Sequence, residues 1–178
     1  MAACRKPPRR KERACGRPAA ALRSRTVELR PASPADEGFI ADLSAEAFAP
    51  FGDYRELLPR WAAIPGISVW VAEEERPVGF VMVGFYYGDP RRSWVYADML
   101  AIAVIAGRRG RGVGRRLLRK AVEIARETAL EVRELRLTVA DTNDGAQRLF
   151  ASEGFRLSDE THGRYDGGQL ALRMRRPL

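Results

Sequence analysis

A glycine-rich loop between a predicted strand and a predicted helix constrains this chain more than any other feature. Residues 107–114 read GRRGRGVG. The mostly apolar residues 94–104 predict a long strand before the loop, and residues 113–128 carry apolar side chains at helical spacing after it. Glycines let a backbone approach a ligand closely, and a helix N-terminus offers free N–H groups and a favourable dipole to an anion. The loop therefore predicts a phosphate-binding site.

The charges around the loop indicate a ligand with more than one phosphate. From Arg108 to Lys120 there are seven basic residues and no acid. The loop matches neither of two well-known phosphate-binding motifs. It lacks the Gly-x-Gly-x-x-Gly spacing of dinucleotide-binding folds, and it lacks the Gly-Lys-Ser/Thr ending of nucleoside-triphosphate loops. A glycine turn before a solvated basic helix remains the alternative interpretation.

The rest of the body alternates strands and helices. Ser33 and Pro34 are typical of a helix start, and the helix they begin is expected to run to about residue 48. Further helices are predicted at 54–62, 113–128 and 142–152, and strands at 26–30, 67–73, 78–87, 94–104, 135–139, 154–157 and 169–175. This order predicts a single α/β (α+β) domain over residues 26–178, built around a mostly antiparallel sheet.

Residues 1–25 form a predicted disordered basic tail, rich in Arg, Pro, Ala and Gly and without apolar periodicity. Residues 1–30 hold ten basic and two acidic side chains. The difference of eight charges equals the net charge of the whole protein, +8, so the charges of residues 31–178 cancel. The tail is interpreted first as an unstructured extension, then as a weak electrostatic arm for RNA or anionic surfaces, and last as a transit peptide. Nucleic acid is expected only as a weak partner of this tail.

Composition excludes several other classes of protein. No apolar run approaches the ~20 residues of a membrane-spanning helix and no secretory signal is present, so we expect a cytoplasmic protein with no membrane partner. Cys4 and Cys15 both lie in the tail, and His162 is the only histidine. We therefore expect no metal site and interpret His162 as a surface or loop residue. A homodimer is compatible with the sequence.

Two segments resemble the motifs of one enzyme superfamily. Residues 104–114, VIAGRRGRGVG, resemble the acetyl-CoA motif of the GNAT N-acetyltransferases, which is Val, a proline-containing turn and then Arg/Gln-x-x-Gly-x-Gly/Ala; only the proline departs, as Ala106. Residues 143–155, NDGAQRLFASEGF, resemble the pattern Asn-x-x-Ala-x-x-Leu-Tyr-x-x-x-Gly-Phe. The resemblance covers about residues 26–175. It implies helices on both faces of the sheet and a cleft for acetyl-CoA where the fourth and fifth strands splay apart.

The resemblance also implies which residues contact acetyl-CoA. The pantetheine arm would lie along the end of the strand before the loop, the pyrophosphate would lie on the loop, and Asn143 would lie near the thiol. The predicted contacts are Ile102, Ala103, Val104, Arg109, Gly110, Arg111, Gly112, Val113, Gly114, Arg115, Asn143 and Phe150.

Asp98 and Val104 are the candidate groups for direct attack of an amine on the acetyl carbonyl. The backbone N–H of Val104 would stabilise the oxyanion. Asp98 is the candidate base, because it lies six residues earlier and even spacing in an uninterrupted strand would put both residues on the same face. Its apolar and aromatic neighbours would raise its pKa by desolvation. The alternative is a solvated or arginine-paired aspartate.

This chain departs from the family pattern at the positions expected to supply the general acid, the group that gives a proton to the leaving thiolate. Many members carry a tyrosine where this chain has Phe150, and some protein-N-terminal acetyltransferases carry a glutamate where it has Thr138. Tyr165 is a substitute candidate, with a core-covering loop aromatic as the alternative. The thiolate can also take its proton from water.

The acceptor cleft is implied to lie between residues 48–54, 86–89 and 162–168. These segments are rich in aromatic residues with scattered acids, which suits an amine beside an apolar group. We therefore predict an N-acetyltransferase that acetylates a primary amine of a small molecule or of a protein or peptide. The alternative is a catalytically silent CoA-binding module that senses acetyl-CoA or docks a partner.

The domain boundary can be tested by truncation. Deleting residues 1–25 should leave acetyl-CoA binding intact, because the periodic elements begin near Thr26. Isothermal titration of both forms with acetyl-CoA measures this. Loss of cooperative unfolding in the truncated form would instead assign the tail a structural role.

Overall fold

The computed structural model describes residues 26–128 and 130–178, so the predicted tail lies outside the described residues. The element order follows the prediction, and β6 alone differs strongly, because it continues well past residue 157. The elements are β1 (Glu28–Pro31), η1 (Pro34–Asp36), α1 (Glu37–Ala47), α2 (Leu57–Ala62), β2 (Ser68–Glu73), β3 (Pro77–Tyr87), β4 (Val95–Val104), η2 (Ala106–Arg108), α3 (Val113–Glu127), β5 (Val132–Ala140), α4 (Asp144–Ser152), β6 (Arg156–Arg164) and β7 (Leu170–Pro177).

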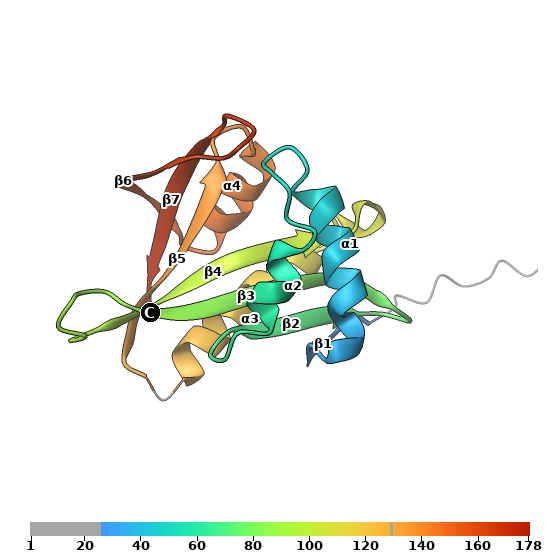
Figure 1. Ribbon diagram of the computed structural model, residues 1–178, viewed down its shortest axis with the longest axis horizontal. Helices are drawn as coiled ribbons and strands as arrows, with labels where there is room; N and C mark the ends of the chain where they lie inside the picture. Colours follow the sequence, from blue (N-terminus) through green and yellow to red (C-terminus); the bar gives the residue numbers. More distant parts are fainter. Residues whose placement is uncertain (1–25, 129) are drawn as a thin grey trace, which may run out of the picture.

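One sheet connects all the strands of the described residues, in the order β1-β2-β3-β4-β5-β7-β6. Every neighbouring pair is antiparallel except β4 and β5, which are parallel. Helices cover both faces, with α1 and α2 on the face nearer the viewer in Figure 1 and α3 behind the sheet. The predicted α/β fold with a mostly antiparallel sheet is confirmed. No helix in the described ranges is long and apolar enough to cross a bilayer.

Two apolar cores hold these layers together. Leu117, Leu118 and Phe150, from α3 and α4, pack with strand residues such as Leu135 and Leu137 on one face of the sheet. On the other face Ile40 and Leu43 of α1 and Leu58 of α2 pack with a second set, which comes from β2, β3 and β4: Val71, Phe80, Met82, Ala101 and Ala103. The second core includes no described residue of β5, β6 or β7, so the α1 and α2 layer covers only half of its face.

A β-bulge interrupts β4 in the middle of the sheet. Met82 and Val83 of β3 pair with Ala101 and Met99, so Leu100 is an extra residue without a partner on β3. Pairing of β4 with β5 ends at Met99 and Leu137, and beyond this point the two strands diverge, as Figure 1 shows. The predicted splay is confirmed.

The bulge corrects one expectation about Asp98. An extra residue reverses which side chains face which layer, and Met99 accordingly belongs to the α3 core while Ala101 belongs to the α1–α2 core. Asp98 therefore lies on the α1–α2 face of the sheet, whereas Val104 packs on the α3 face. The even spacing does not put the two side chains on the same face.

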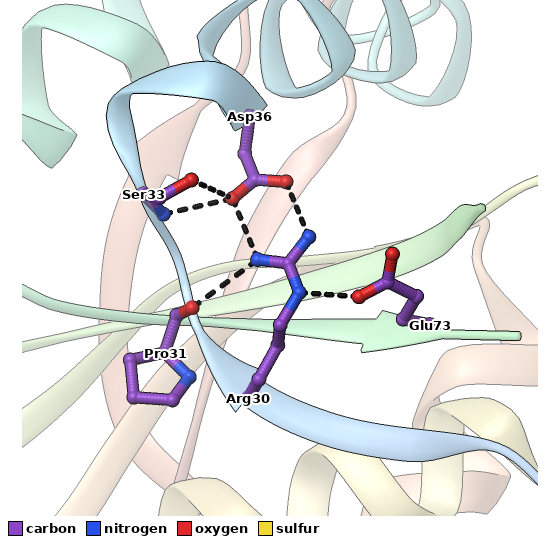
Figure 2. A network of polar contacts seen from close by, with 5 residues as sticks. All are labelled: Arg30, Pro31, Ser33, Asp36 and Glu73. Carbon is purple, nitrogen blue, oxygen red and sulfur yellow. Dashed lines mark hydrogen bonds and ion pairs between the residues drawn. The ribbon is translucent and has the colours of Figure 1, made fainter. Parts of the chain in front are cut away.

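A polar network fixes the start of α1 against β1 and β2 (Figure 2). The carboxylate of Asp36, 3% exposed, accepts two hydrogen bonds from the guanidinium of Arg30, at 2.7 and 2.8 Å. It also accepts from the backbone N–H and the hydroxyl of Ser33, at 2.8 and 3.0 Å. Arg30 donates as well to Glu73 at the end of β2. Chiefly because Arg30 stabilises the charged form, the pKa of Asp36 is well below its usual value.

Asp36→Asn should destabilise the fold by about 1.5–3 kcal/mol near neutral pH, since an amide NH₂ would face the guanidinium donors. The lowered pKa of Asp36 stabilises the fold above the ordinary carboxyl pKa of about 4, and this contribution falls as pH drops further. The difference between the two proteins in urea unfolding should therefore shrink below about pH 4. Asp42→Asn, which changes an exposed ion pair with Arg55, is the matched control and should cost less than about 1 kcal/mol. A similar loss in both variants would contradict this role of Asp36.

Candidate active site

The glycine loop has the geometry of an anion site at a helix N-terminus. Gly110 and Gly112 have φ of 74° and 82°, a left-handed conformation that favours glycine. Gly112 is the N-cap of α3, and a Cβ at either glycine would meet no atom within 4 Å, so the space in front of the backbone is open. The first N–H groups of α3 have no intrahelical partners and are directed into this region.

Fewer basic residues around the loop are free to bind a phosphate than their number in the sequence suggests. Arg108 forms an ion pair with Glu74 at 2.9 Å, and Arg119 forms one with Glu153 at 2.9 Å. The ammonium of Lys120 lies 3.8 Å from the ring centroid of Trp70, on another side of α3. These three cations therefore have protein partners, which the local sequence does not reveal because the partners are distant in the chain.

A cavity of about 650 Å³ extends from the loop to the ends of β4 and α4. Two predicted contacts are not among its lining residues: the side chain of Val113 is buried in the α3 core, and Arg111 is exposed to solvent outside the cavity. The remaining predicted contacts all line it: Ile102, Ala103, Val104, Arg109, Gly110, Gly112, Gly114, Arg115, Asn143 and Phe150.

The main chain of β4 faces the gap beside β5. The N–H of Ile105 donates to Val78 O at 3.0 Å, so the alternation of antiparallel hydrogen bonds directs Ala103 toward β3. The N–H and C=O groups of Ile102 and Val104 then point away from β3, into the region where pairing with β5 has ended. Arg109 Nε donates to Val104 O at 2.9 Å, a contact that sequence reasoning missed.

A second cavity, of about 400 Å³, adjoins the first on the α1–α2 side. Asp98, Thr138 and Tyr165 are among its lining residues. The residues that line both cavities are Phe48, Phe51, Ile102, Asn143, Ala146 and Phe150. The two cavities therefore adjoin at the point where β4 and β5 separate.

Burial dominates the electrostatics of Asp98. Desolvation raises the pKa of its carboxyl, and the positive charges of Arg173 and Arg136 partly oppose the rise. Across residues 26–128 and 130–178, no hydrogen bond to this carboxylate is found. Asp98 is therefore a carboxylate with a raised pKa and a free proton-accepting capacity inside a cavity.

Tyr165 supplies a hydroxyl to the same cavity. Burial raises the pKa of its phenol, and an interaction with the hydroxyl of Thr138 partly opposes this. Phe150 is buried, 3% exposed, and packs on Phe155 with ring centroids 6.1 Å apart. The junction of the cavities thus has an apolar ring where the family pattern has a tyrosine, and Tyr165 and Thr138 lie beyond it.

Two of the three predicted acceptor segments meet at this cavity. Gln169 Nε2 donates to Pro50 O at 3.0 Å, and the rings of Phe51 and Tyr165 lie 5.2 Å apart. These contacts join the α1–α2 loop to the β6–β7 hairpin above the gap. In the third segment, Tyr86 and Tyr87 instead line a separate depression at the other end of β3.

His162 is exposed, in agreement with its interpretation as a surface or loop residue, but it lies on a strand and lines a cavity. It lies on β6 and is one of the residues that line the second cavity. Its Nδ1 lies 2.7 Å from Arg173 Nη2, and because arginine only donates, Nδ1 accepts this hydrogen bond. No local pattern indicates this pair, since residues 156–164 are polar apart from Leu157 and show no apolar alternation.

The described part of the chain contains no group of three or more His, Cys, Asp or Glu side chains placed to hold a metal ion. The polar groups that line the two cavities include carboxylates, phenols, arginines, one imidazole, the hydroxyl of Thr138 and the amide of Asn143.

Comparison with known families decides the class of this protein. The model of the Acetyltransferase (GNAT) family matches residues 37–155, which include the glycine loop, the whole lining of the first cavity and most of the lining of the second. The chain belongs to the GNAT acetyltransferase family. Acetyl-CoA is the co-substrate of this acetyltransferase, and the cavity on the glycine loop is where the family motif lies. No curated protein matches the sequence significantly.

Solved structures of similar fold support the same architecture for this acetyltransferase. NAA60 of Arabidopsis thaliana, in complex with a bisubstrate analogue, has a TM-score of 0.74 at 20% identity, covering 86% of this chain and 99% of that one. The ribosomal-protein-alanine N-acetyltransferase of Brucella melitensis has a TM-score of 0.70 at 24% identity, covering 85% and 99%. The acetyltransferase yncA of Salmonella typhimurium, with acetyl-CoA, has a TM-score of 0.72 at 20% identity, covering 85% and 94%.

Acetyl-CoA at 100 times its Kd should stabilise this protein by about 2.7 kcal/mol through mass action. For a domain of this size that is a rise in Tm of about 5–10 °C, which thermal unfolding measures. Gly112→Asp should abolish the rise, because a carboxylate would lie beside the pyrophosphate.

Gly112→Asn is the matched control. Asn has the same shape as Asp and tolerates the left-handed conformation, but it adds no charge. It should retain more of the Tm rise than Gly112→Asp does. Equal acetyl-CoA affinity in wild type and Gly112→Asp would show that the pyrophosphate lies elsewhere.

Proposed function

We propose that this acetyltransferase transfers the acetyl group of acetyl-CoA directly to a primary amine of a small molecule or of a protein or peptide. The proposal rests on the wall that the two cavities share. One cavity contains the glycine loop and the β4 edge, and the other contains Asp98 and Tyr165. An amine in the second cavity would meet the thioester at their shared wall, beside Ile102 and Phe150.

Each group has a role in the transfer. Asp98 accepts a proton from the ammonium form of the acceptor, directly or through a water, and the neutral nitrogen attacks the acetyl carbonyl carbon. The backbone N–H of Val104, on the unpaired edge of β4, donates to the oxyanion that forms. The nitrogen then releases its second proton to solvent, the carbon–sulfur bond breaks, and the thiolate leaves on the coenzyme.

Tyr165 is the proposed proton donor to the departing thiolate, because Phe150 has no proton to give. Burial keeps its phenol protonated over the working pH range, since its pKa is raised above the usual value. Water can replace this proton, so we assign Tyr165 a smaller kinetic role than Asp98.

A binding protein without catalysis is the second candidate. Phe150 at the junction favours it, since a phenylalanine cannot act as an acid. The presence of Asp98 and Tyr165 in the adjoining cavity favours the enzyme. Release of free thiol from acetyl-CoA in the presence of peptides, polyamines, amino acids or aminoglycosides separates the two functions.

Asp98→Asn keeps the shape of the side chain but cannot accept a proton. The rate of thiol release at neutral pH should fall by about 10²–10⁴-fold with acetyl-CoA affinity little changed. The loss should shrink as pH rises, because more acceptor amine is then already neutral. In the wild type, activity should rise with pH through the raised pKa of Asp98.

Glu127→Gln, a carboxylate-to-amide change at the exposed end of α3, is the matched control and should behave as wild type. A loss in Asp98→Asn that does not vary with pH would indicate substrate positioning instead of proton transfer. An unchanged rate across the pH range would remove Asp98 from the mechanism.

A further inference from the structure

A row of charged residues crosses the sheet from the candidate base to its edge. Asp98 of β4 is the register partner of Arg136 of β5, Arg136 is the partner of Arg175 of β7, and Arg175 is the partner of Arg156 of β6. Residues directly opposite one another lie on the same face of a sheet. Three arginines therefore extend in line from Asp98 to the outermost strand.

This row lies on the face of the sheet that α1 and α2 leave uncovered. Leu135 and Leu137, which flank Arg136 on β5, are buried against α3, so Arg136 faces the other way. The α1–α2 core takes residues only from β2, β3 and β4 among the strands described. Arg156 and Arg175 are exposed, so the outer half of the row is open to a partner.

The charges of the row are compensated only at its inner end. Arg136 forms an ion pair with Glu134 and lies 4.0 Å from the ring centroid of Tyr96. Neither Arg156 nor Arg175 has an ion-pair partner within residues 26–128 and 130–178. Like charges directly opposite on a sheet destabilise it, so these neighbouring arginines leave a site that an anion would stabilise.

A second set of cations lies beside the row. Arg173 is the register partner of Thr138, one step along the strands from Arg136, and it donates to His162. Arg164 lines the acceptor cavity. The cationic surface therefore continues from the wall of the acceptor cavity to Arg156 at the edge of the sheet.

We infer that the acceptor is an acidic peptide segment, whose amine lies at Asp98 and whose carboxylates lie over Arg175 and Arg156. This inference rests on the proposed N-acetyltransferase function. The row spans three interstrand spacings of about 4.8 Å, roughly 14 Å in total. An extended peptide rises about 3.4 Å per residue, so the carboxylates belong at about the third to fifth residue from the acetylated amine.

A peptide fits this surface better than the other anionic acceptors. A small amine is too short to reach Arg156 from Asp98. A nucleic acid would match the charge, but it offers no aliphatic amine to the thioester, and the row begins at the carboxylate proposed to deprotonate one. The body of the chain from residue 31 onward is also electrically balanced, so the cationic surface is a local feature.

Three synthetic peptides of one length test the inference. The first carries Asp or Glu at positions 3–5, the second carries Asn or Gln at those positions, and the third carries the acids at positions 8–10. Wild type should prefer the first peptide by about threefold to tenfold in kcat/KM at low salt, as expected for two exposed ion pairs. The preference should shrink between about 0.01 M and about 1 M salt, where the Debye length falls from about 30 Å to about 3 Å.

The double variant Arg156→Gln with Arg175→Gln should bring the ratio of kcat/KM for the first and second peptides close to one. Arg126→Gln, which removes an exposed arginine of α3, is the matched control and should keep the wild-type ratio. Single variants at Arg156 and Arg175 should each give an intermediate ratio. They also test the inference if the double variant unfolds.

The outcomes separate the inference from the proposed function. Acetylation of all three peptides with equal kcat/KM by wild type would overturn the acidic acceptor and leave the amine transfer standing. Equal rates together with binding of a single-stranded oligonucleotide that the double variant loses would assign the row to nucleic acid instead. No thiol release with any amine, while acetyl-CoA still raises Tm, would overturn both proposals.

Discussion

The extra residue at Leu100 is the constraint on which the rest of the site depends. A regular β4 would continue its ladder with β5 to the end, and the main-chain groups of Ile102 and Val104 would be hydrogen-bonded inside the sheet. The bulge turns β4 away after Met99, so these groups face a gap instead. Both cavities open at this gap, one toward the glycine loop and the other toward Asp98.

The same bulge explains how groups on opposite faces can act together. Side chains stand perpendicular to a sheet, whereas the N–H and C=O groups lie in its plane. The carboxylate of Asp98 therefore approaches the gap from the α1–α2 side, and the N–H of Val104 approaches from within the sheet. The proposed base and the proposed oxyanion donor can therefore act on the same substrate although their side chains lie on opposite faces of the sheet, because both groups reach the same gap.

Local patterns predicted the elements and the glycine loop, because apolar periodicity and glycine positions are encoded within a few residues. The bulge was not predictable from this sequence alone, since residues 95–104 contain no glycine or proline and are apolar throughout from Met99 to Val104. Contacts between distant segments were equally hidden: Arg108 with Glu74, Lys120 with Trp70, and Arg173 with His162. The charge row depends on how β4, β5, β7 and β6 pair with one another. The sequence indicates the periodicity of these strands but not their pairing.

The link between the α1–α2 loop and the β6–β7 hairpin has a kinetic consequence. It joins Pro50 to Gln169 near the wall that the two cavities share, where the proposed coenzyme and acceptor sites adjoin. No serine or cysteine among the described residues lines either cavity, so no thiol or primary hydroxyl stands ready to carry the acetyl group. In the proposed direct transfer both substrates are held at once, in a ternary complex, and the double-reciprocal plots of such an enzyme intersect instead of running parallel.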